Sequence, residues 1–275
     1  MFNRKFWGSL VHADLPRKLS NTPLRVVIFT MKTTFLVRLL QLHLMLFINP
    51  LLSQTSYEWN KITSISVRER EVSIASDSLL KKYVKINEIS KLQFLAKRKT
   101  SVSYLTCDTL QLRKKKGVLS LPTQRGIRKF IDKDPFDETK QEYSYLGQIK
   151  FLGVYVVGGL YWEELDYKFV SKKDGKELQS FIDFPYISQN KKFIVCVYGD
   201  PYSEESQFEL FSIVKNKVKS IFYTSFKNWM AAPEMKSFWG ADGYFYIAAL
   251  DKKKSYWDND GNYRTDYKYL KLTIL

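Results

Sequence analysis

The fold class is decided by Phe193-Ile-Val-Cys-Val-Tyr198 and by the two apolar runs after it, Phe208–Val214 and Val218–Tyr223. Each run is short and rich in aromatic and β-branched residues, which favour pleated strands. Turn-forming pairs separate the runs, Asp200-Pro201 before the second and Asn216-Lys217 before the third. Three strands joined by short turns predict an antiparallel meander.

The same pattern extends over residues 134–275. No long helical period interrupts it, which argues against a parallel sheet with crossover helices. We therefore predict a mainly β fold of antiparallel meander sheets. The further apolar runs are Phe151–Val157, Tyr167–Val170, Tyr244–Leu250 and Tyr267–Ile274, and the further turn pairs are Asp174-Gly175, Asn190-Lys191, Asp242-Gly243 and Asp260-Gly261.

Residues 54–133 are a basic and less regular N-terminal region. Asp77 is suited to a helix N-cap, and the apolar residues after it follow at the spacing of one helical face. This spacing predicts a short amphipathic helix near residues 78–86. Two strands are also expected in this region, at Val102–Leu112 and Gly117–Pro122.

One stretch of the β region carries a recognisable turn motif. The segment Pro185-Tyr-Ile-Ser-Gln-Asn-Lys-Lys-Phe-Ile-Val195 resembles the Ser-Pro-Asp-Gly-Lys turn of TolB-type β-propeller repeats, which are found in secreted bacterial proteins. Ser188 and Lys192 match the motif, and Asn190 replaces Asp with similar turn ability. The other two turn positions differ from the Pro and Gly of the family.

A second stretch, Trp239-Gly-Ala-Asp-Gly-Tyr-Phe-Tyr-Ile247, is similar to the same element. The resemblance covers residues 140–275 and implies repeated four-stranded blades. A closed propeller needs at least four such blades. The sequence therefore leaves two alternatives, an ordinary set of antiparallel sheets and an incomplete or irregular β-propeller.

Residues 31–53 have the three parts of a secretory signal peptide in the right order. Lys32 and Arg38 supply a positive start, Leu39–Leu52 is almost wholly apolar, and Ser53 is a small residue before the expected cleavage site. The apolar stretch is short for a membrane-spanning helix, which needs about 20 residues. We predict export, and we expect no stable membrane span after cleavage. An uncleaved anchor and a buried helix are the alternatives.

Residues 1–30 precede this segment and show no clear periodicity. We predict that translation begins at Met31 and that the first 30 residues are an over-extended start. The mature chain would then begin near Gln54.

The positive charge of the chain is concentrated in one segment. The formal net charge is +16, and residues 81–133 contain fifteen basic and three acidic residues. A solvated basic face and a polyanion-binding surface both fit this segment. Export argues against nucleic acid as a partner, so none is expected.

Histidine is nearly absent, which limits the chemistry. The two histidines, His12 and His43, both lie before the expected mature start. A mature chain without histidine excludes Ser-His-Asp and Cys-His catalysis and histidine-containing metal sites. No glycine-rich phosphate-binding motif occurs either. We predict no cofactor and no metal site.

Carboxylate chemistry remains open. Glu163 and Glu164 lie beside Trp162, but neighbouring residues of a strand point to opposite faces, so these two carboxylates would not pair. Asp258–Asn262 has oxygen-bearing side chains at alternate positions, but its glycine is misplaced for a calcium loop. We predict a hairpin turn there and name no catalytic residue.

The candidate ligand-binding residues are Trp162, Trp239 and Trp257, which fall near strand ends or turns, where exposed rings stack on sugars or anchor a protein partner. Burial of these rings in the core is the alternative. Cys107 and Cys196 form one disulfide or remain two unpaired thiols.

Export, the missing histidine and the repeated hairpins together favour a secreted or periplasmic, non-catalytic β domain that binds a protein or glycan partner. The alternative is a carboxylate-dependent hydrolase of cell-surface polysaccharide, because that chemistry needs no histidine.

Overall fold

The computed structural model describes residues 59–67, 77–110, 112–133, 138–162, 164–261, 263–264 and 266–275. All of them belong to one unit, Gln54–Leu275. The predictions for residues 1–30 and 31–53 lie outside the described residues.

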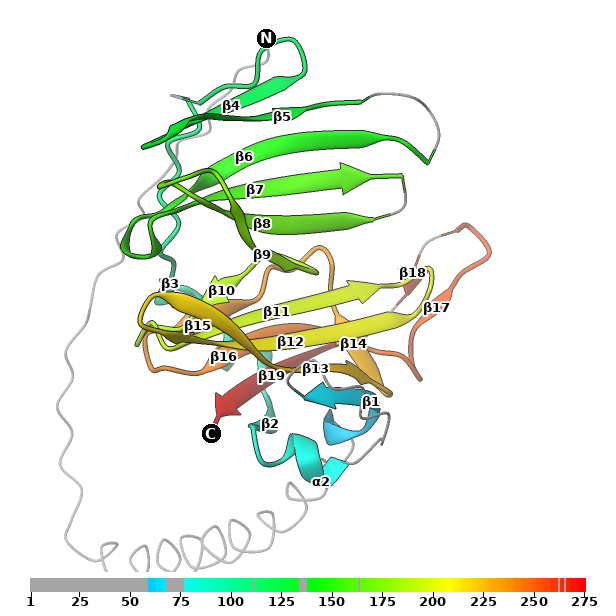
Figure 1. The fold of residues 1–275 in the computed structure, drawn as a ribbon. Helices are drawn as coiled ribbons and strands as arrows, with labels where there is room; N and C mark the ends of the chain where they lie inside the picture. Colours follow the sequence, from blue (N-terminus) through cyan, green and yellow to red (C-terminus); the bar gives the residue numbers. More distant parts are fainter. Residues whose placement is uncertain are drawn as a thin grey trace, which may run out of the picture. The chain divides into compact units, whose positions relative to one another are not determined.

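The described strands form three larger antiparallel sheets (Figure 1). The first has four strands, β6 (Gln141–Ile149), β7 (Val154–Tyr161), β8 (Leu165–Ser171) and β9 (Glu177–Phe181). The second adds β1 (Ile62–Val67) to the meander of β10 (Tyr186–Ile187), β11 (Phe193–Asp200), β12 (Glu205–Val214) and β13 (Lys217–Phe226). The predicted meander is thus confirmed.

The third sheet has six strands, with β2, β19, β16, β15 and β3 in order and β14 paired to β16. Their bounds are β2 (Val84–Ile89), β3 (Ser101–Val102), β14 (Trp229–Ala231), β15 (Phe238–Gly240), β16 (Phe245–Asp251) and β19 (Tyr267–Ile274). Two small hairpins complete the strands, β4 (Val118–Thr123) with β5 (Gly126–Ile131) and β17 (Tyr256–Trp257) with β18 (Tyr263–Arg264). The prediction of a mainly β, antiparallel fold is confirmed.

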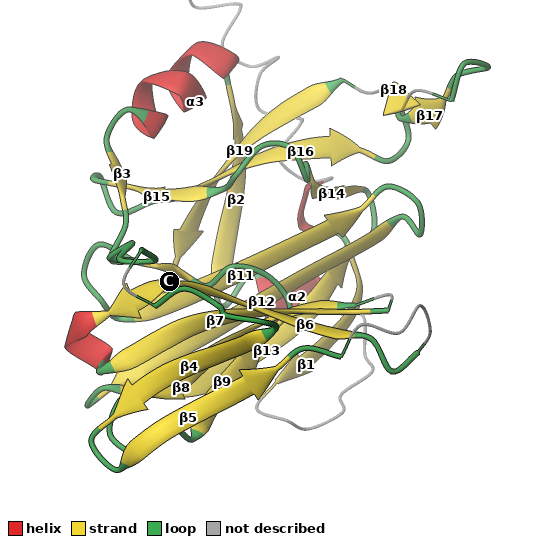
Figure 2. Cartoon of the chain, turned by 90° about the horizontal axis from the view of Figure 1, so that it is seen from above, coloured by secondary structure: helices red, strands yellow, loops and turns green. Residues whose placement is uncertain are grey.

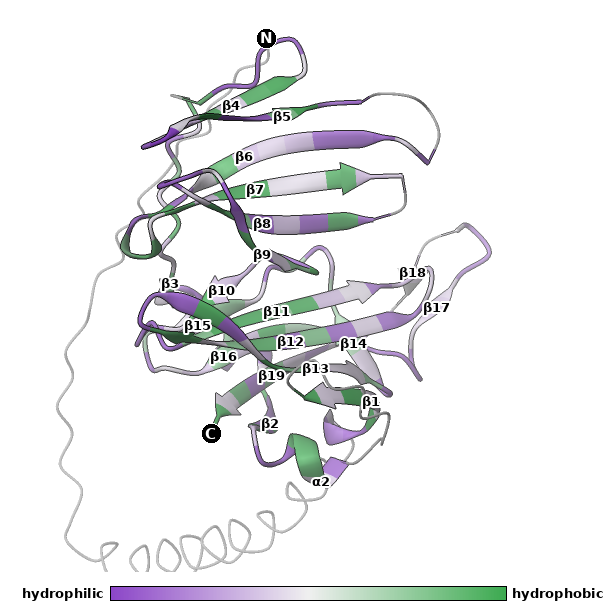
Figure 3. Ribbon diagram, in the orientation of Figure 1, coloured by the Kyte–Doolittle hydropathy of each residue, from purple (hydrophilic) through white to green (hydrophobic). Residues whose placement is uncertain are grey.

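Strands β11 and β16 are buried on both faces over most of their length, which explains why their apolar runs are continuous. On β11, Ile194 and Cys196 face a cluster shared with the β6–β9 sheet, whereas Val195 and Val197 face a cluster shared with the third sheet. Because successive side chains of a strand point to opposite faces, a strand between two cores needs apolar residues at every position. In Figure 3 the central part of β11 is green, the colour of hydrophobic residues.

Four hydrophobic clusters hold the sheets together. Each fully buried Val, Leu, Ile or Phe contributes roughly 1.5–3 kcal/mol of transfer free energy, so these clusters dominate the stability of the fold. The cluster on the far face of the third sheet is closed by α3 (Lys91–Arg98), whose Phe94 is fully buried there (Figure 2).

The N-terminal region is built into the sheets of the C-terminal region. Strand β1 pairs with β13, and β2 pairs with β19. The helix expected near residues 78–86 is therefore wrong beyond its first turn, because α2 covers Asp77–Leu80 alone. Val84 and Ile86 are buried in strand β2, where pairing with β19 outweighs the local helical spacing.

The strand expected at Val102–Leu112 is also wrong in its extent. Of the described residues in this range, only Val102 belongs to a strand, β3 (Ser101–Val102), and Thr106 makes an isolated bridge with Gln148. The strand expected at Gly117–Pro122 is confirmed as β4. The run at Phe151–Val157 begins with a 3-10 turn, η3 (Lys150–Leu152), before β7.

The predicted turn pairs all lie at strand connections. Lys215 and Asn216 both have positive φ, 50° and 59°, in the two-residue turn between β12 and β13. At the turn between β10 and β11, the Ser188 hydroxyl accepts hydrogen bonds from the N–H groups of Lys192 and Phe193, at 3.2 and 2.9 Å. These hydrogen bonds explain why the segment forms a turn. The β-propeller itself stays a prediction.

Among the described residues, no helix has the length and apolar character that crossing a bilayer requires.

Candidate functional site

A cavity with a volume of about 680 Å³ is lined by all three larger sheets. Its walls come from β3 and the segment after it, from the connector between β9 and β10, and from the segment between β14 and β15. This volume lies within the range of about 300–1,000 Å³ that ligand pockets have.

Aromatic side chains form much of the cavity wall. Tyr104, Tyr167, Phe184, Tyr186 and Tyr198 line it, and all are half-buried. The Phe184 ring contacts the rings of Tyr167 and Tyr186, with centroids 5.8 and 5.0 Å away. These side chains therefore offer ring faces and hydroxyl groups to a ligand while their other edges pack on one another.

Specific contacts hold this wall in place. The Tyr104 hydroxyl donates a hydrogen bond to the backbone oxygen of Gln189 at 2.5 Å. The indole N–H of Trp239 donates to the backbone oxygen of Tyr186 at 2.9 Å. The wall is thus anchored to the third sheet.

The cavity contains one acidic side chain, Asp183, on the connector between β9 and β10. Burial raises the pKa of its carboxyl to about 6, although the N–H of Phe184 and the charge of Lys236 act in the opposite direction. The Phe184 N–H donates to this carboxylate at 2.6 Å. At neutral pH, Asp183 is a poorly hydrated carboxylate that can accept hydrogen bonds from ligand hydroxyl groups.

Cationic and hydroxyl groups also contribute to the cavity lining. Lys236 and Arg98 are exposed on its lining, and Ser103 and Ser237 add hydroxyl groups. The cavity is thus mainly aromatic and apolar, with a few polar groups that could orient a ligand.

The three predicted tryptophans do not meet at this site. Trp239 is 2% exposed and belongs to the core, so its proposed role as a surface ring is corrected. Trp162 is 41% exposed just after β7, and Trp257 is 43% exposed on β17 with its ring 5.0 Å from that of Tyr202. Neither Trp162 nor Trp257 lines the cavity.

Both cysteines are free thiols, so the alternative of a Cys107–Cys196 disulfide is not realised in this structure. Cys107 is exposed, whereas Cys196 is fully buried between two sheets. Burial, with the nearby Glu209 and Asp183, raises the pKa of the Cys196 thiol. A buried thiol of this kind is unreactive.

The other predicted acidic residues lie elsewhere. Glu163 falls outside the described residues, and Glu164 is exposed with its backbone oxygen accepting the N–H of Tyr161. Asp258 and Asp260 form the turn between β17 and β18, where the Asp260 N–H donates to the Asp258 carboxylate at 3.1 Å. No metal-binding group of three or more His, Cys, Asp or Glu side chains occurs in the described ranges.

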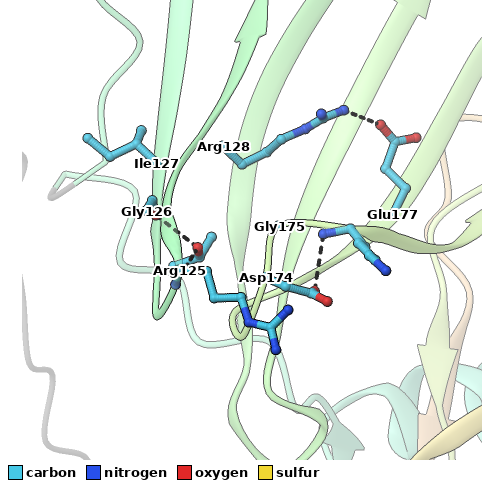
Figure 4. A pocket seen from close by; sticks show the side chains of 9 residues that line it. Arg125, Gly126, Ile127, Arg128, Asp174, Gly175 and Glu177 are labelled. Atoms are coloured by element: carbon cyan, nitrogen blue, oxygen red, sulfur yellow. Dashed lines mark hydrogen bonds and ion pairs between the residues drawn. The ribbon is translucent and has the colours of Figure 1, made fainter.

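A second hollow of about 500 Å³ lies between the β4–β5 and β8–β9 turns (Figure 4). Three basic and two acidic side chains line it, and Arg128 pairs with Glu177 at 2.9 Å. Asp174 accepts the N–H of Lys176, and Arg125 lies close to it. None of the described side chains that line this hollow is aromatic. The aromatic cavity is therefore the better candidate for ligand binding.

Comparisons with protein-family models, curated proteins and solved structures find no match to this chain. Its function is therefore inferred from the side chains of the cavity. One sequence pattern that could have pointed to this site was not used in the predictions. Asp183-Phe-Pro-Tyr186 places two aromatic residues around a proline directly after a strand, where a rigid connector presents its side chains outside the sheet.

Proposed function

We propose that this chain is an exported, non-catalytic binding protein, and that the cavity between its sheets binds a segment of glycan. The cavity wall of five half-buried aromatic side chains carries this proposal. Sugar rings present apolar C–H faces to aromatic rings and hydroxyl groups to acceptors such as Asp183. Export is proposed from the signal-peptide pattern, and the resemblance to TolB-type repeats supports it.

A glycan segment fits this cavity better than a folded protein does. A stable protein interface covers about 800 Å² of each partner and is usually flat, whereas this site is a concave pocket of about 680 Å³. The aromatic wall and its few polar groups match the needs of a small, hydroxyl-rich ligand.

The alternative, a polysaccharide hydrolase, is supported by one feature. A desolvated carboxyl with a pKa of about 6 has the property of a general acid. Glycoside hydrolysis normally needs two carboxyl groups about 5–10 Å apart. Asp183 is the single acidic side chain among the described residues of the cavity lining. The binding function is therefore the better supported of the two.

The direct test is titration of the full chain with a panel of neutral oligosaccharides, measured by calorimetry. We expect at least one member to bind, and Phe184→Ala to weaken that binding about tenfold, because one aromatic contact is worth about 1–1.5 kcal/mol. Tyr202→Ala is the matched control, since Tyr202 is exposed and lies outside the cavity. Failure of every oligosaccharide, or an unchanged affinity for Phe184→Ala, would reject the proposed site.

Hydrolysis is tested in parallel by measuring the release of reducing ends from the same panel. We expect none. Release that Asp183→Asn abolishes would replace the binding proposal with the hydrolase.

Export is tested by the mass of the mature N-terminus. We expect it near Gln54, and a peptide from residues 5–25 in the exported protein would contradict the proposed start at Met31.

A further inference from the structure

The small β4–β5 sheet has one covered face and one open face. Leu119, Leu121 and Phe130 are buried against the β6–β9 sheet. The residues that alternate with these along β4 and β5 point to the open side, and we call them the hairpin face. They are Val118, Ser120, Pro122, Ile127, Lys129 and Ile131.

The hairpin face exposes large apolar side chains. Ile127 is 66% exposed and Ile131 is 59% exposed. The strand register places Val118 opposite Ile131 and Pro122 opposite Ile127. Two apolar cross-strand pairs therefore flank a central polar pair of Ser120 and Lys129.

The charge around the hairpin face is positive. Lys129 stands at its centre, and the exposed Lys115, Lys116, Arg125 and Lys133 lie on the same hairpin and its flanks. Part of the basic segment at residues 81–133 therefore lies around the hairpin face.

The acidic neighbours point away from the hairpin face. Asp132 pairs with Lys114 at 2.5 Å and accepts the N–H of Tyr143 on β6, which places its carboxylate on the covered side. Glu177 pairs with Arg128, whose parity is that of the covered residues. Among the described residues of the β4–β5 sheet, the open face therefore carries no negative charge.

We propose that the hairpin face docks on an anionic lipid surface. Ile127 and Ile131 enter the boundary between headgroups and acyl chains, and Lys129 with the surrounding cations contacts lipid phosphates. Exposed apolar side chains interleaved with basic ones are the combination that interfacial membrane binding uses. This proposal does not depend on the glycan site, which lies between the larger sheets.

The size of the hairpin face favours a lipid surface over a protein. Two six-residue strands span roughly 20 Å by 10 Å, or about 200 Å². A stable protein interface needs about 800 Å² on each side. A bilayer imposes no such minimum, because a few inserted side chains and several cations suffice for reversible binding. An acidic glycan would use the cations but not the isoleucines.

The test is flotation of the full chain with vesicles of phosphatidylcholine alone and with vesicles that contain about 30% phosphatidylglycerol. We expect at least about tenfold stronger binding to the anionic vesicles, and weaker binding as salt rises. Because the apolar segment Leu39–Leu52 could bind lipid by itself, each comparison is made between variants of the same chain.

Two substitutions separate the contributions. Lys129→Gln should weaken binding to anionic vesicles about fivefold, the usual effect of one basic residue near such a surface. Ile131→Gln should weaken it about tenfold through lost insertion. Lys219→Gln and Val214→Gln are the matched controls, because both residues are exposed on the second sheet. Near-ultraviolet circular dichroism verifies that each variant is folded.

Two results would overturn the proposal. Binding to anionic vesicles that Lys129→Gln leaves unchanged would reject the role of the cations. Binding to heparin that requires Lys129 but not Ile131, without vesicle binding, would show that this face binds an acidic polysaccharide instead.

Discussion

The Glu209 carboxylate accepts a hydrogen bond from the backbone N–H of Ile182 at 3.1 Å. This bond joins the middle of β12 to the connector that carries Asp183 into the cavity. Glu209 lies directly opposite Cys196 in the strand register, on the side that faces the β6–β9 sheet. Burial there raises the pKa of Glu209 to about 7.

This pKa makes the fold more stable in mild acid than in mild base. The ordinary pKa of a glutamate is 4.5, and the folded value is about 7. Folding therefore favours the protonated carboxyl of Glu209. The stability that this group contributes is complete below pH 4.5 and is lost as the pH rises through 7. Asp183, with a pKa raised to about 6, acts in the same direction.

Glu209→Gln should remove most of this dependence. The amide is neutral at every pH and keeps an oxygen that accepts from Ile182. We expect a gain in the free energy of unfolding of up to about 3 kcal/mol at pH 8, and little change at pH 5. Chemical denaturation at both pH values measures it, with Glu205→Gln, exposed on the same strand, as control. A variant less stable than the wild type at pH 8 would contradict this explanation.

The two thiols should differ sharply in reactivity. Cys107 is exposed and Cys196 is fully buried, and neither is bonded. A thiol reagent should therefore modify one cysteine in the native protein and two in denaturant. Peptide mass mapping should locate the native modification at Cys107. Two thiols that react only after reduction would show a disulfide instead.

The strands were predictable because their signals are local. The turn expected at Asn216-Lys217 forms one residue earlier, at Lys215 and Asn216, and the flanking aromatic and β-branched runs form β12 and β13. The unbroken apolar run of β11 accounts for its burial on both faces. Which sheet lies on each face is set by contacts between distant segments, which no local pattern reports.

The cavity was not predictable for the same reason. Its wall includes Tyr104, whose hydroxyl is bound by Gln189, 85 residues along the chain. Only the completed fold brings such residues together. Tryptophan near a strand end was a poor guide, because Trp239 serves the core and supports the cavity through the backbone of Tyr186.

Gly199 should tolerate no side chain. It lines the cavity on β11, and an added Cβ would lie 2.2 Å from the backbone oxygen of Ala231. Because backbone cannot yield as a flexible side chain does, Gly199→Ala should cost about 3 kcal/mol or more in the free energy of unfolding. The control is Gly158→Ala on β7, where the nearest atom is 3.8 Å away. Equal stability of both variants would show that β11 and β14 are not in such close contact.

Helix α3, which was not predicted from the sequence, offers the last prediction. Ser90 and Gln93 form a capping box, since the Ser90 hydroxyl accepts the Gln93 N–H at 3.2 Å and the Gln93 side chain accepts the Ser90 N–H at 3.0 Å. Phe94 then enters the core beside Phe238 and Tyr269, with centroids 5.1 and 4.8 Å away.

Phe94→Ala should therefore lower the free energy of unfolding by about 3–5 kcal/mol, because it leaves a cavity in the cluster that α3 closes. Leu92→Ala removes an apolar side chain from the same helix, but Leu92 is 80% exposed, so we expect a change within about 0.5 kcal/mol. Denaturant titration of both variants measures the difference. Similar losses for the two would mean that α3 does not pack on the third sheet through Phe94.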